Sequence, residues 1–443
     1  MISLQISSCN DIIQQKVRKL VGFMRLERLY FDIDNVKPGG KSGIDGKALC
    51  LDMSELEEIS GDAAFSRVEI SIAAPGSGTR IFNVGDITQP SVRIDAKDTT
   101  FSGLVGKMFT VGQGRSLALR GVVVTEAVEV EVDIPSFLQL CDEAAEITDF
   151  AAMWHVVINA FPAPGVAKYD YLSALNLASK RVAQFIAELA EGLEPDEREV
   201  FELECKGADS LPRVAYLANV FCHRPYTESL IYGASMLESL PTILHPNEIL
   251  DGALINRDYD NATNADPTFV WQNHPIILEL YRRHGVDLEF AGVVVSNVHH
   301  ELTWKERNAT MASAMLNNYL NADAVIITKE GGGHPQVDIG IAVDTLEGRY
   351  GIKTAVLLVE MLSAKNDSDG QIIFRSDYAD AMVSTGCAAT VVLPPSDSAV
   401  GSISMDKRGN AGIGENGEMT IAHRALKGGQ SQLGWTKHGS LKF

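Results

Sequence analysis

The stretch Pro275-Ile-Ile-Leu-Glu-Leu-Tyr-Arg-Arg-His284, followed by Leu288-Glu-Phe-Ala-Gly-Val-Val-Val-Ser296, decides the fold class of this chain. Its first part has proline at the start, arginines near the end and Gly285 beyond, which is the pattern of a complete helix. The second part is a mostly apolar run, typical of a strand buried on both faces of a sheet. A helix that leads into such a strand indicates an α/β fold.

The same alternation continues toward the C-terminus. A capping box of Thr303 and Glu306 predicts a helix that runs to about residue 320, and Ala324-Val-Ile-Ile327 predicts the next strand. Further strands are predicted at 353–359 and 389–393. Helices of ten or more residues between strands favour parallel pairing, so we expect a doubly wound, mostly parallel sheet that binds ligands at the carboxyl ends of its strands.

The first part of the chain carries a different pattern. Short alternating segments such as 67–72 and 122–133, punctuated by glycines, predict a β-rich domain over 24–150, after an N-terminal extension at 1–23. Residues 151–443 are predicted to form a Rossmann-like α/β substrate-binding region, with two subdomains meeting near 255–267. Helices are expected there at 171–191 and in the acidic patch 194–204.

Length, charge and cysteine usage exclude several classes of function. A chain of 443 residues favours two or three domains, and its net charge of -20 repels phosphate backbones and anionic membrane surfaces. Nucleic-acid binding and membrane association are therefore disfavoured. No apolar run is long enough to span a bilayer, and residues 1–23 lack a signal core, so a cytoplasmic protein is expected. The six cysteines form no C-x-x-C pair and are interpreted as reduced thiols.

A glycine-rich loop follows the strand predicted at 324–327. It reads Lys329-Glu-Gly-Gly-Gly-His-Pro335, and Asp338 opens the next helix. Glu330 and His334 are candidate acid–base groups. An anionic group could dock where three glycines let the backbone approach a ligand near a helix N-terminus: Gly331, Gly332 and Gly333. A plain tight turn also explains these glycines, and the spacing is not that of a nucleotide-binding loop.

Two histidines end the preceding strand, in Asn297-Val-His-His-Glu301. His299 and His300 are candidates for substrate binding or proton transfer. Adjacent side chains in extended backbone point apart, so one of the two is expected to be structural. No third ligand at helical spacing supports a metal ion, and no metal site is assigned.

Two cysteines follow predicted strands. Cys387, in Ser384-Thr-Gly-Cys-Ala388, is a candidate catalytic thiol, with a buried inert thiol as the alternative. Cys222 ends the apolar run 214–221, where the neighbouring His223 and Arg224 could lower a thiol pKa or bind a carboxylate. Arg224 is the preferred anchor for a substrate carboxylate.

Several extended segments carry a family resemblance: Met24-Arg-Leu-Glu27, Phe109-Thr-Val-Gly-Gln-Gly-Arg115, 243–253, 266–275, Glu330-Gly-Gly-Gly-His-Pro335 and the Leu433-Gly434 ending. From Met24 onward the chain resembles the proprotein of component B of the glycine, sarcosine and betaine reductases, which is related to the D-proline reductase proprotein. The resemblance implies a hetero-oligomer in which a partner subunit's selenol or thiol reductively cleaves an amino acid or betaine. This chain would hold that amine or betaine substrate.

One departure from the family concerns its cofactor. Well-known members cut themselves before a cysteine, which becomes a pyruvoyl group that forms a Schiff base with the substrate amine. Here the segment reads Ile255-Asn-Arg-Asp-Tyr-Asp-Asn-Ala-Thr-Asn-Ala-Asp-Pro267, with Tyr259 and Thr263 in place of the family's two cysteines. Tyrosine cannot perform the acyl shift, so no pyruvoyl group is predicted. A 2-oxobutyryl group made from Thr263 is the open alternative.

The residues around this departure are themselves candidates. Asp258, Tyr259 and Asp260 lie where the resemblance places the family's carbonyl, and the two aspartate carboxylates could hold a cationic substrate. Trp271 or Tyr259 could supply a cation–π face, and Tyr259 is kept as a candidate catalytic residue. Solvated loop carboxylates are the alternative interpretation.

Three functions follow from these residues. The first is a reductase-complex subunit that acts with a partner selenol or thiol and has no pyruvoyl group, inactive alone. The second is a non-catalytic binding or scaffold subunit with the same fold. The third is a metal-dependent hydrolase or lyase that uses some of four side chains: His299, His300, Glu301 and His334.

Overall fold

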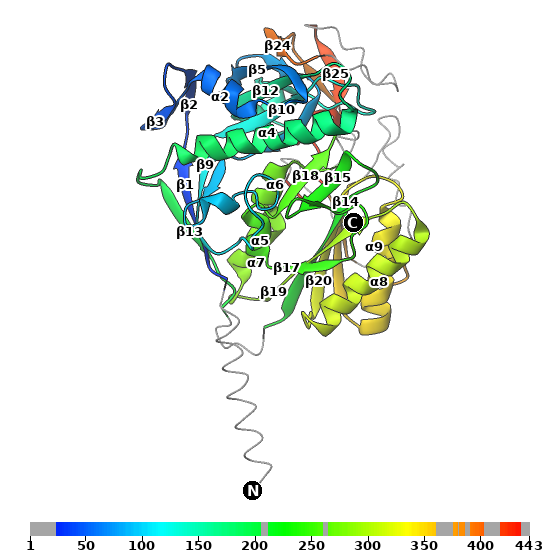
Figure 1. The fold of residues 1–443 in the computed structure, drawn as a ribbon. Helices are drawn as coiled ribbons and strands as arrows, with labels where there is room; N and C mark the ends of the chain where they lie inside the picture. Colours follow the sequence, from blue (N-terminus) through cyan, green and yellow to red (C-terminus); the bar gives the residue numbers. More distant parts are fainter. Residues whose placement is uncertain are drawn as a thin grey trace.

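The computed structural model describes residues 24–204, 211–259, 265–359, 375–379, 381–385, 390–402 and 417–435. Strands and helices alternate through much of this part of the chain, and several sheets stack with helices against them (Figure 1). The α/β class predicted from the sequence is therefore confirmed. No helix within these residues is long and apolar enough to cross a membrane.

A six-stranded sheet organises the C-terminal half. Its order is β17 (Thr242–Leu244), β19 (Glu289–Val298), β14 (Arg213–Phe221), β20 (Ala324–Lys329), β21 (Lys353–Leu358) and β22 (Met382–Ser384). Neighbours from β19 to β22 pair in parallel, and only β17 at the edge is antiparallel to its neighbour. The predicted parallel pairing is confirmed for these strands, so their carboxyl ends share one edge of the sheet.

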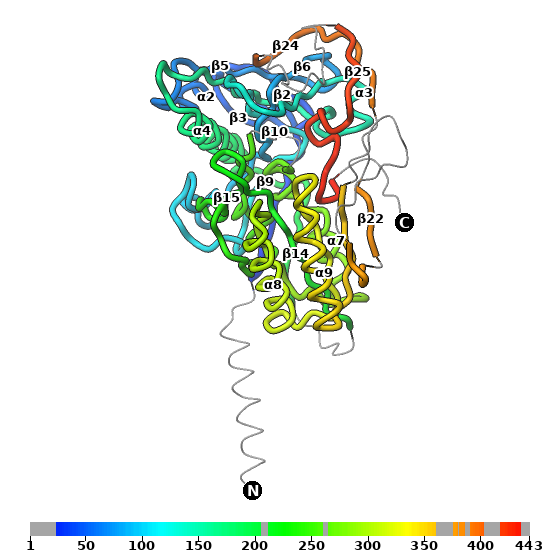
Figure 2. The backbone as a smooth tube through the Cα atoms, turned by 90° about the vertical axis from the view of Figure 1, so that its right-hand side faces the viewer, coloured from blue at the N-terminus to red at the C-terminus, as the bar shows by residue number. Residues whose placement is uncertain are grey.

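Helices pack on both faces of this sheet. On one face, α7 (Pro275–Arg283) packs in the same core as Tyr216 and Ala218 of β14. On the other face, α8 (Leu302–Asn318) and α9 (Gln336–Val343) pack with the alternate β14 residues Ala215 and Leu217. Figure 2 shows these two helices side by side along β14. Successive side chains of a strand point to opposite faces, which gives β14 its two apolar faces.

The start of α8 differs from the prediction. The helix begins at Leu302 and its N-cap is Glu301, without a side-chain capping bond. Thr303 therefore lies inside the first turn, and a residue in helical conformation cannot serve as the N-cap. The predicted capping box of Thr303 and Glu306 is wrong, although the helix itself is present.

The N-terminal half contains two four-stranded sheets. The first has the order β13 (Glu197–Phe201), β1 (Leu26–Asp32), β9 (Gly114–Arg120) and β8 (Ser91–Arg93). The second has the order β5 (Phe65–Ala73), β12 (Trp154–Pro162), β10 (Val122–Val128) and β7 (Val84–Thr88). The long helix α4 (Lys168–Glu188) packs between them, with Leu172 and Ile186 in one core with Leu117 and Val124 (Figure 1).

Two strands from beyond residue 150 take part in these sheets. β12 pairs with β5 and β10, and β13 pairs with β1. The predicted division near residue 150 stays a prediction, but the sheets join the segments on its two sides. The acidic patch that was predicted to be helical contains the strand β13, so that helix is wrong.

The C-terminal segment returns to the N-terminal half. β23 (Thr390–Leu393) pairs antiparallel with β25 (Met419–Ala422). The prediction that 389–393 joins the parallel sheet is therefore wrong. β24 (Ser398–Val400) pairs with β6 (Thr79–Ile81), which also pairs with β11 (Leu138–Gln139). In Figure 2 the orange and red C-terminal strands accordingly lie beside the blue N-terminal ones.

Shorter elements complete the fold. One small sheet joins β2 (Asn35–Pro38), β4 (Ala48–Leu51) and β3 (Gly43–Asp45), beside α2 (Met53–Ser60). A second joins β16 (Ala234–Ser235), β15 (Thr227–Ile231) and β18 (Leu254–Asp258). The remaining helices are short: α3 (Asp142–Ala145), α5 (Pro246–Leu250), α6 (Thr268–Gln272), 3-10 turns at 97–99, 149–152 and 423–425, and a seven-residue π-helix at Asp344–Tyr350.

Candidate functional site

Four histidines meet at the carboxyl edge of the six-stranded sheet; we refer to His223, His299, His300 and His334 as the histidine cluster. The rings of His223 and His334 stack with their centroids 4.8 Å apart. The rings of His299 and His300 stack at 4.5 Å, and His300 meets His223 edge-on at 6.2 Å. Three separate strand ends therefore bring these side chains together, since His223 follows β14, the pair follows β19 and His334 follows β20.

The cluster is open to solvent on one side. His300 and His334 are exposed, His223 is half-buried and His299 is buried. Burial lowers the pKa of His223 to about 3 and that of His334 to about 4, and the nearby Lys305 adds to both shifts. These two imidazoles are therefore neutral at physiological pH, and can both donate and accept hydrogen bonds.

Two lysines stand behind the histidines. Lys305 of α8 forms a buried ion pair with Asp338 of α9, with Nζ and Oδ2 2.5 Å apart, and burial raises the pKa of Asp338 to about 6. Lys329, the last residue of β20, is fully buried and donates to the Gly331 carbonyl and to Oε1 of Gln432. Burial lowers the pKa of Lys329 to about 7, and no carboxylate among the described residues lies within 4.0 Å of its Nζ.

The glycine loop has the conformation that only glycine adopts readily. Gly331 has φ +83°, and a Cβ there would meet the Phe221 ring at 2.4 Å. Gly333 has φ +75° but faces open space. Because Gly331 has no side chain, the loop can turn sharply there and its backbone can pack against the Phe221 ring at the end of β14.

Glu330 links two strand ends instead of facing solvent. It is fully buried, and its carboxylate accepts hydrogen bonds from the backbone N–H groups of Phe221 and Asp266, both at 2.9 Å. Burial raises its pKa to about 8, with a further contribution from Asp266. Glu330 thereby ties the end of β14 to the segment that leads into α6.

Tyr259 belongs to a buried ionic network, by which we mean Asp86, Glu126 and Lys180. Its hydroxyl donates to Oε2 of Glu126 at 2.6 Å, and Lys180 Nζ lies 2.5 Å from Asp86 and 3.3 Å from Glu126. All four side chains are buried, and a Cβ on Gly85 would meet the Tyr259 ring at 2.7 Å. The phenol thus fills the space where the family resemblance places the carbonyl.

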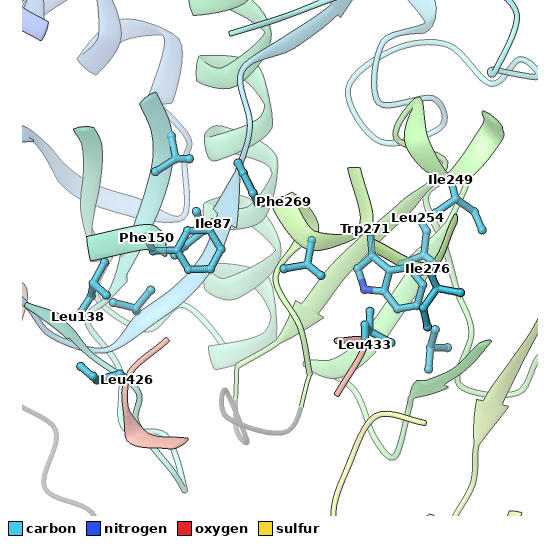
Figure 3. Packing of buried hydrophobic residues seen from close by; sticks show 14 of the residues in the cluster. Ile87, Leu138, Phe150, Ile249, Leu254, Phe269, Trp271, Ile276, Leu426 and Leu433 are labelled. Atoms are coloured by element: carbon cyan, nitrogen blue, oxygen red, sulfur yellow. The ribbon is translucent and has the colours of Figure 1, made fainter. Parts of the chain in front are cut away.

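The predicted cation-binding face is not formed by the residues proposed for it. Trp271 is fully buried in α6 and packs against Ile249, Leu254, Ile276 and Leu433, as Figure 3 shows. Its ring meets that of His274 edge-on at 5.1 Å. Asp258 is buried at the end of β18. Neither side chain reaches solvent, because the short helix α6 and strand β18 direct both into the core between the sheets.

Arg224, which follows His223 in sequence, contacts the N-terminal half. Its exposed side chain forms an ion pair with Asp133 of the N-terminal half, at 2.9 Å. Its role as a carboxylate anchor stays a prediction. Asp260, Thr263 and Cys387 lie outside the described residues.

Several groups of the site were not predicted from the sequence. Lys305 and Lys329 were not singled out, although a lysine that ends a buried strand is itself an indication of a strand-end site. The ionic network could not be found, because Asp86 and Lys180 are 94 residues apart. Within the described residues, no group of three His, Cys, Asp or Glu side chains is placed to hold a metal ion.

Comparison with known proteins shows the family of the chain. The model of the glycine/sarcosine/betaine reductase component B subunits matches residues 24–440. The chain belongs to this family. The resemblance predicted from the sequence is confirmed, and so is its main consequence, a subunit of the reductase-complex type.

Relatives with different substrates in their names match this chain over most of its length. It is 29% identical over 428 residues to the glycine reductase complex component B subunits alpha and beta of Acetoanaerobium sticklandii, covering 94% of this chain and 99% of the relative. The sarcosine reductase complex component B subunit alpha of Peptoclostridium acidaminophilum is 28% identical, over 82% and 86% of the two chains. The betaine counterpart from the same organism is 27% identical, over 95% and 100%. No solved structure matches the chain.

Proposed function

We propose that this component B chain is the substrate-binding subunit of a glycine/sarcosine/betaine reductase-like complex. It holds an amino acid or betaine-like substrate while the selenol or thiol of a partner subunit attacks the carbon that bears the nitrogen. It does so without a pyruvoyl group, and is inactive alone. The complex is a hetero-oligomer.

The convergence of the histidine cluster at one sheet edge carries this proposal. In open α/β sheets, ligands bind outside the carboxyl ends of the strands, where the connections diverge. His223, His300 and His334 reach solvent at this edge from three different strands. Together with a family match that spans residues 24–440, this supports a site for a small polar substrate.

The surroundings of Tyr259 do not fit a pyruvoyl group made at that position. An acyl shift needs a nucleophilic oxygen or sulfur on Cβ, where it can reach the preceding carbonyl carbon through a five-membered ring. The Tyr259 oxygen is at the far end of an aromatic ring and donates to Glu126. Elimination across Cα and Cβ would also require a heteroatom on Cβ as the leaving group. These points support a site that acts through non-covalent binding.

Within the described residues, the thiol beside the histidine cluster also supports dependence on a partner. Cys222 is fully buried next to His223, and burial raises its pKa well above the usual range. A thiol in that state is a poor nucleophile at neutral pH, because the thiolate is the reactive form. The attacking selenolate or thiolate is therefore assigned to the second subunit.

The replacement of the family's processing cysteine by the packed Tyr259 also favours a second function, a binding or scaffold subunit without chemistry. The two functions separate on reconstitution. The purified chain is combined with a partner chain that carries selenocysteine or cysteine, and amine release from glycine, sarcosine and betaine is measured with a dithiol present. Release by the pair but not by either chain supports the proposal. Complex formation without release supports the scaffold function, and release by this chain alone contradicts both.

A further inference from the structure

We propose that the histidine cluster, backed by Lys305 and Lys329, binds the carboxylate of the substrate and takes up a proton as it does so. This inference rests on the proposed function, since it assigns one part of an amino acid or betaine to one part of the sheet edge. It places the carboxylate on the histidine cluster rather than on Arg224, whose exposed side chain is paired with Asp133.

Two buried lysines stand behind this edge, in a chain whose net charge is -20. The titratable groups that face the cluster come from every element packed around it: His223, Glu238, His299, His300, Glu301, Lys305, Lys329, His334 and Asp338. Asp338 is already paired with Lys305, whereas Lys329 has no such counterion among the described residues. Because its pKa is about 7, Lys329 is only partly charged near neutral pH, and a bound anion would favour its charged form.

The two lysines act on the ligand through their field. Both are buried, so their charges are poorly screened by water and reach the solvent-facing histidines. The exposed His300 and His334 and the half-buried His223 supply the ring N–H groups that a carboxylate can contact. The charge of Lys329 favours a carboxylate over a cationic amine here, so the site favours the acidic end of the substrate.

The chemistry of the relatives' named substrates also favours a carboxylate site. Glycine, sarcosine and betaine carry a primary, a secondary and a quaternary nitrogen, but each has one identical carboxylate. A site that serves such a series from a shared fold can anchor the carboxylate in a constant way and leave the nitrogen to vary. The histidine cluster provides such an anchor at the edge where three strands end.

Proton uptake follows from the state of the empty cluster. Burial lowers the pKa of His223 and His334, and nearby positive charge lowers both further. An anion placed against the rings favours the imidazolium form and raises those pKa values. By linkage, a ligand that raises a pKa binds together with a proton and binds more tightly as the pH falls.

The full chain can be titrated by calorimetry with glycine, sarcosine, betaine, acetate, methylamine and inorganic phosphate, at pH 6 and pH 8. Each titration is run in two buffers of different ionisation enthalpy, so that proton uptake is measured directly. We expect the four carboxylates to bind about 3- to 10-fold more tightly at pH 6, within the limit of tenfold per pH unit for one linked proton. Methylamine should not bind, and phosphate should not bind more tightly than acetate.

The variants His300→Gln and His334→Gln test the cluster itself, because both side chains are exposed and cost little stability when changed. Each should weaken carboxylate binding at least about 5-fold and reduce the proton uptake, because a glutamine amide can donate a hydrogen bond but cannot take up the proton. His284→Gln is the matched control. That half-buried histidine lies near the opposite end of β19, and its change should leave binding unaltered.

Distinct outcomes separate this inference from the proposed function. Binding of glycine without proton uptake, unchanged in both variants, would overturn the carboxylate site and leave the proposed function standing. Proton-coupled binding of acetate without binding of the three amino acids would support the site and count against the proposed function. Tighter binding of phosphate than of any carboxylate, or equal binding of methylamine, would overturn the assignment.

Discussion

The hydroxyl of Tyr259 donates a hydrogen bond of 2.6 Å to Oε2 of Glu126, across 133 residues of sequence and without exposure to solvent. Glu126 also accepts from Lys180 and from the Asp86 backbone N–H. The phenol is therefore one member of a buried network in which each donor offsets the cost of burying a carboxylate.

Removal of that hydroxyl should be costly. Tyr259→Phe is expected to lower the free energy of unfolding by about 1.5–3 kcal/mol, the usual loss for a hydrogen bond to a charged group. Urea denaturation at pH 7 measures it. Tyr319→Phe is the control, because Tyr319 is 72% exposed, and should change stability by less than about 0.5 kcal/mol. Equal effects of the two changes would show that the bond to Glu126 contributes little.

The chain should remain a single polypeptide. With tyrosine at position 259, the proposed function expects an intact mass near 48.0 kDa and no reaction with hydrazine or borohydride. Mass spectrometry before and after treatment checks both points. Two fragments that meet near Thr263, together with a mass increase on hydrazine treatment, would instead show that threonine has been converted to a 2-oxobutyryl group.

The two outer glycines of the loop should respond differently to alanine. Gly331→Ala introduces a Cβ 2.4 Å from the Phe221 ring as well as an unfavourable φ, whereas Gly333→Ala meets only the unfavourable φ. We expect a loss of about 1–2 kcal/mol for Gly333→Ala and about 1–3 kcal/mol more for Gly331→Ala. Denaturant titration of both variants gives the difference, and similar losses would mean that the Phe221 ring moves aside freely.

Glu330 should make stability depend on pH. In the folded chain its pKa is raised from 4.5 to about 8, so unfolding releases a proton between these values and stability falls as pH rises through that range. The advantage of the wild-type chain over Glu330→Gln should therefore shrink from pH 5.5 to pH 8, by at most about 1.4 kcal/mol per unit. Denaturation of both proteins at each pH measures it, with Glu238→Gln as an exposed control. An advantage that grows with pH would have the wrong sign.

The parallel sheet could be predicted because burial on both faces requires apolar residues throughout a strand. Val293, Val294 and Val295 of β19 show this directly, since all three are fully buried. The histidines at strand ends were found for the same reason. Their mutual contacts could not be, because sequence gives the end of each strand but not which strands are neighbours.

Other features depend on partners far away in the chain. β13 has the composition of a charged helix, yet Glu197 and Glu199 meet Arg120 and Tyr30 across the neighbouring strands. Such cross-strand contacts override local propensity, which is weak for strands. Trp271 was expected to face the substrate for its chemistry alone, but its surroundings are fixed by the packing of α6.

The pairing of β24 with β6 has a consequence for biosynthesis. Ser398 and Thr79 share a hydrogen bond of 2.9 Å between their hydroxyls, 319 residues apart, and β24 follows Thr79–Ile81 in register. A nascent chain on the ribosome cannot form this pair until nearly the whole protein has been translated. The edge of β6 that β24 covers is until then a stretch of unpaired backbone of the kind that chaperones protect and that aggregation exploits.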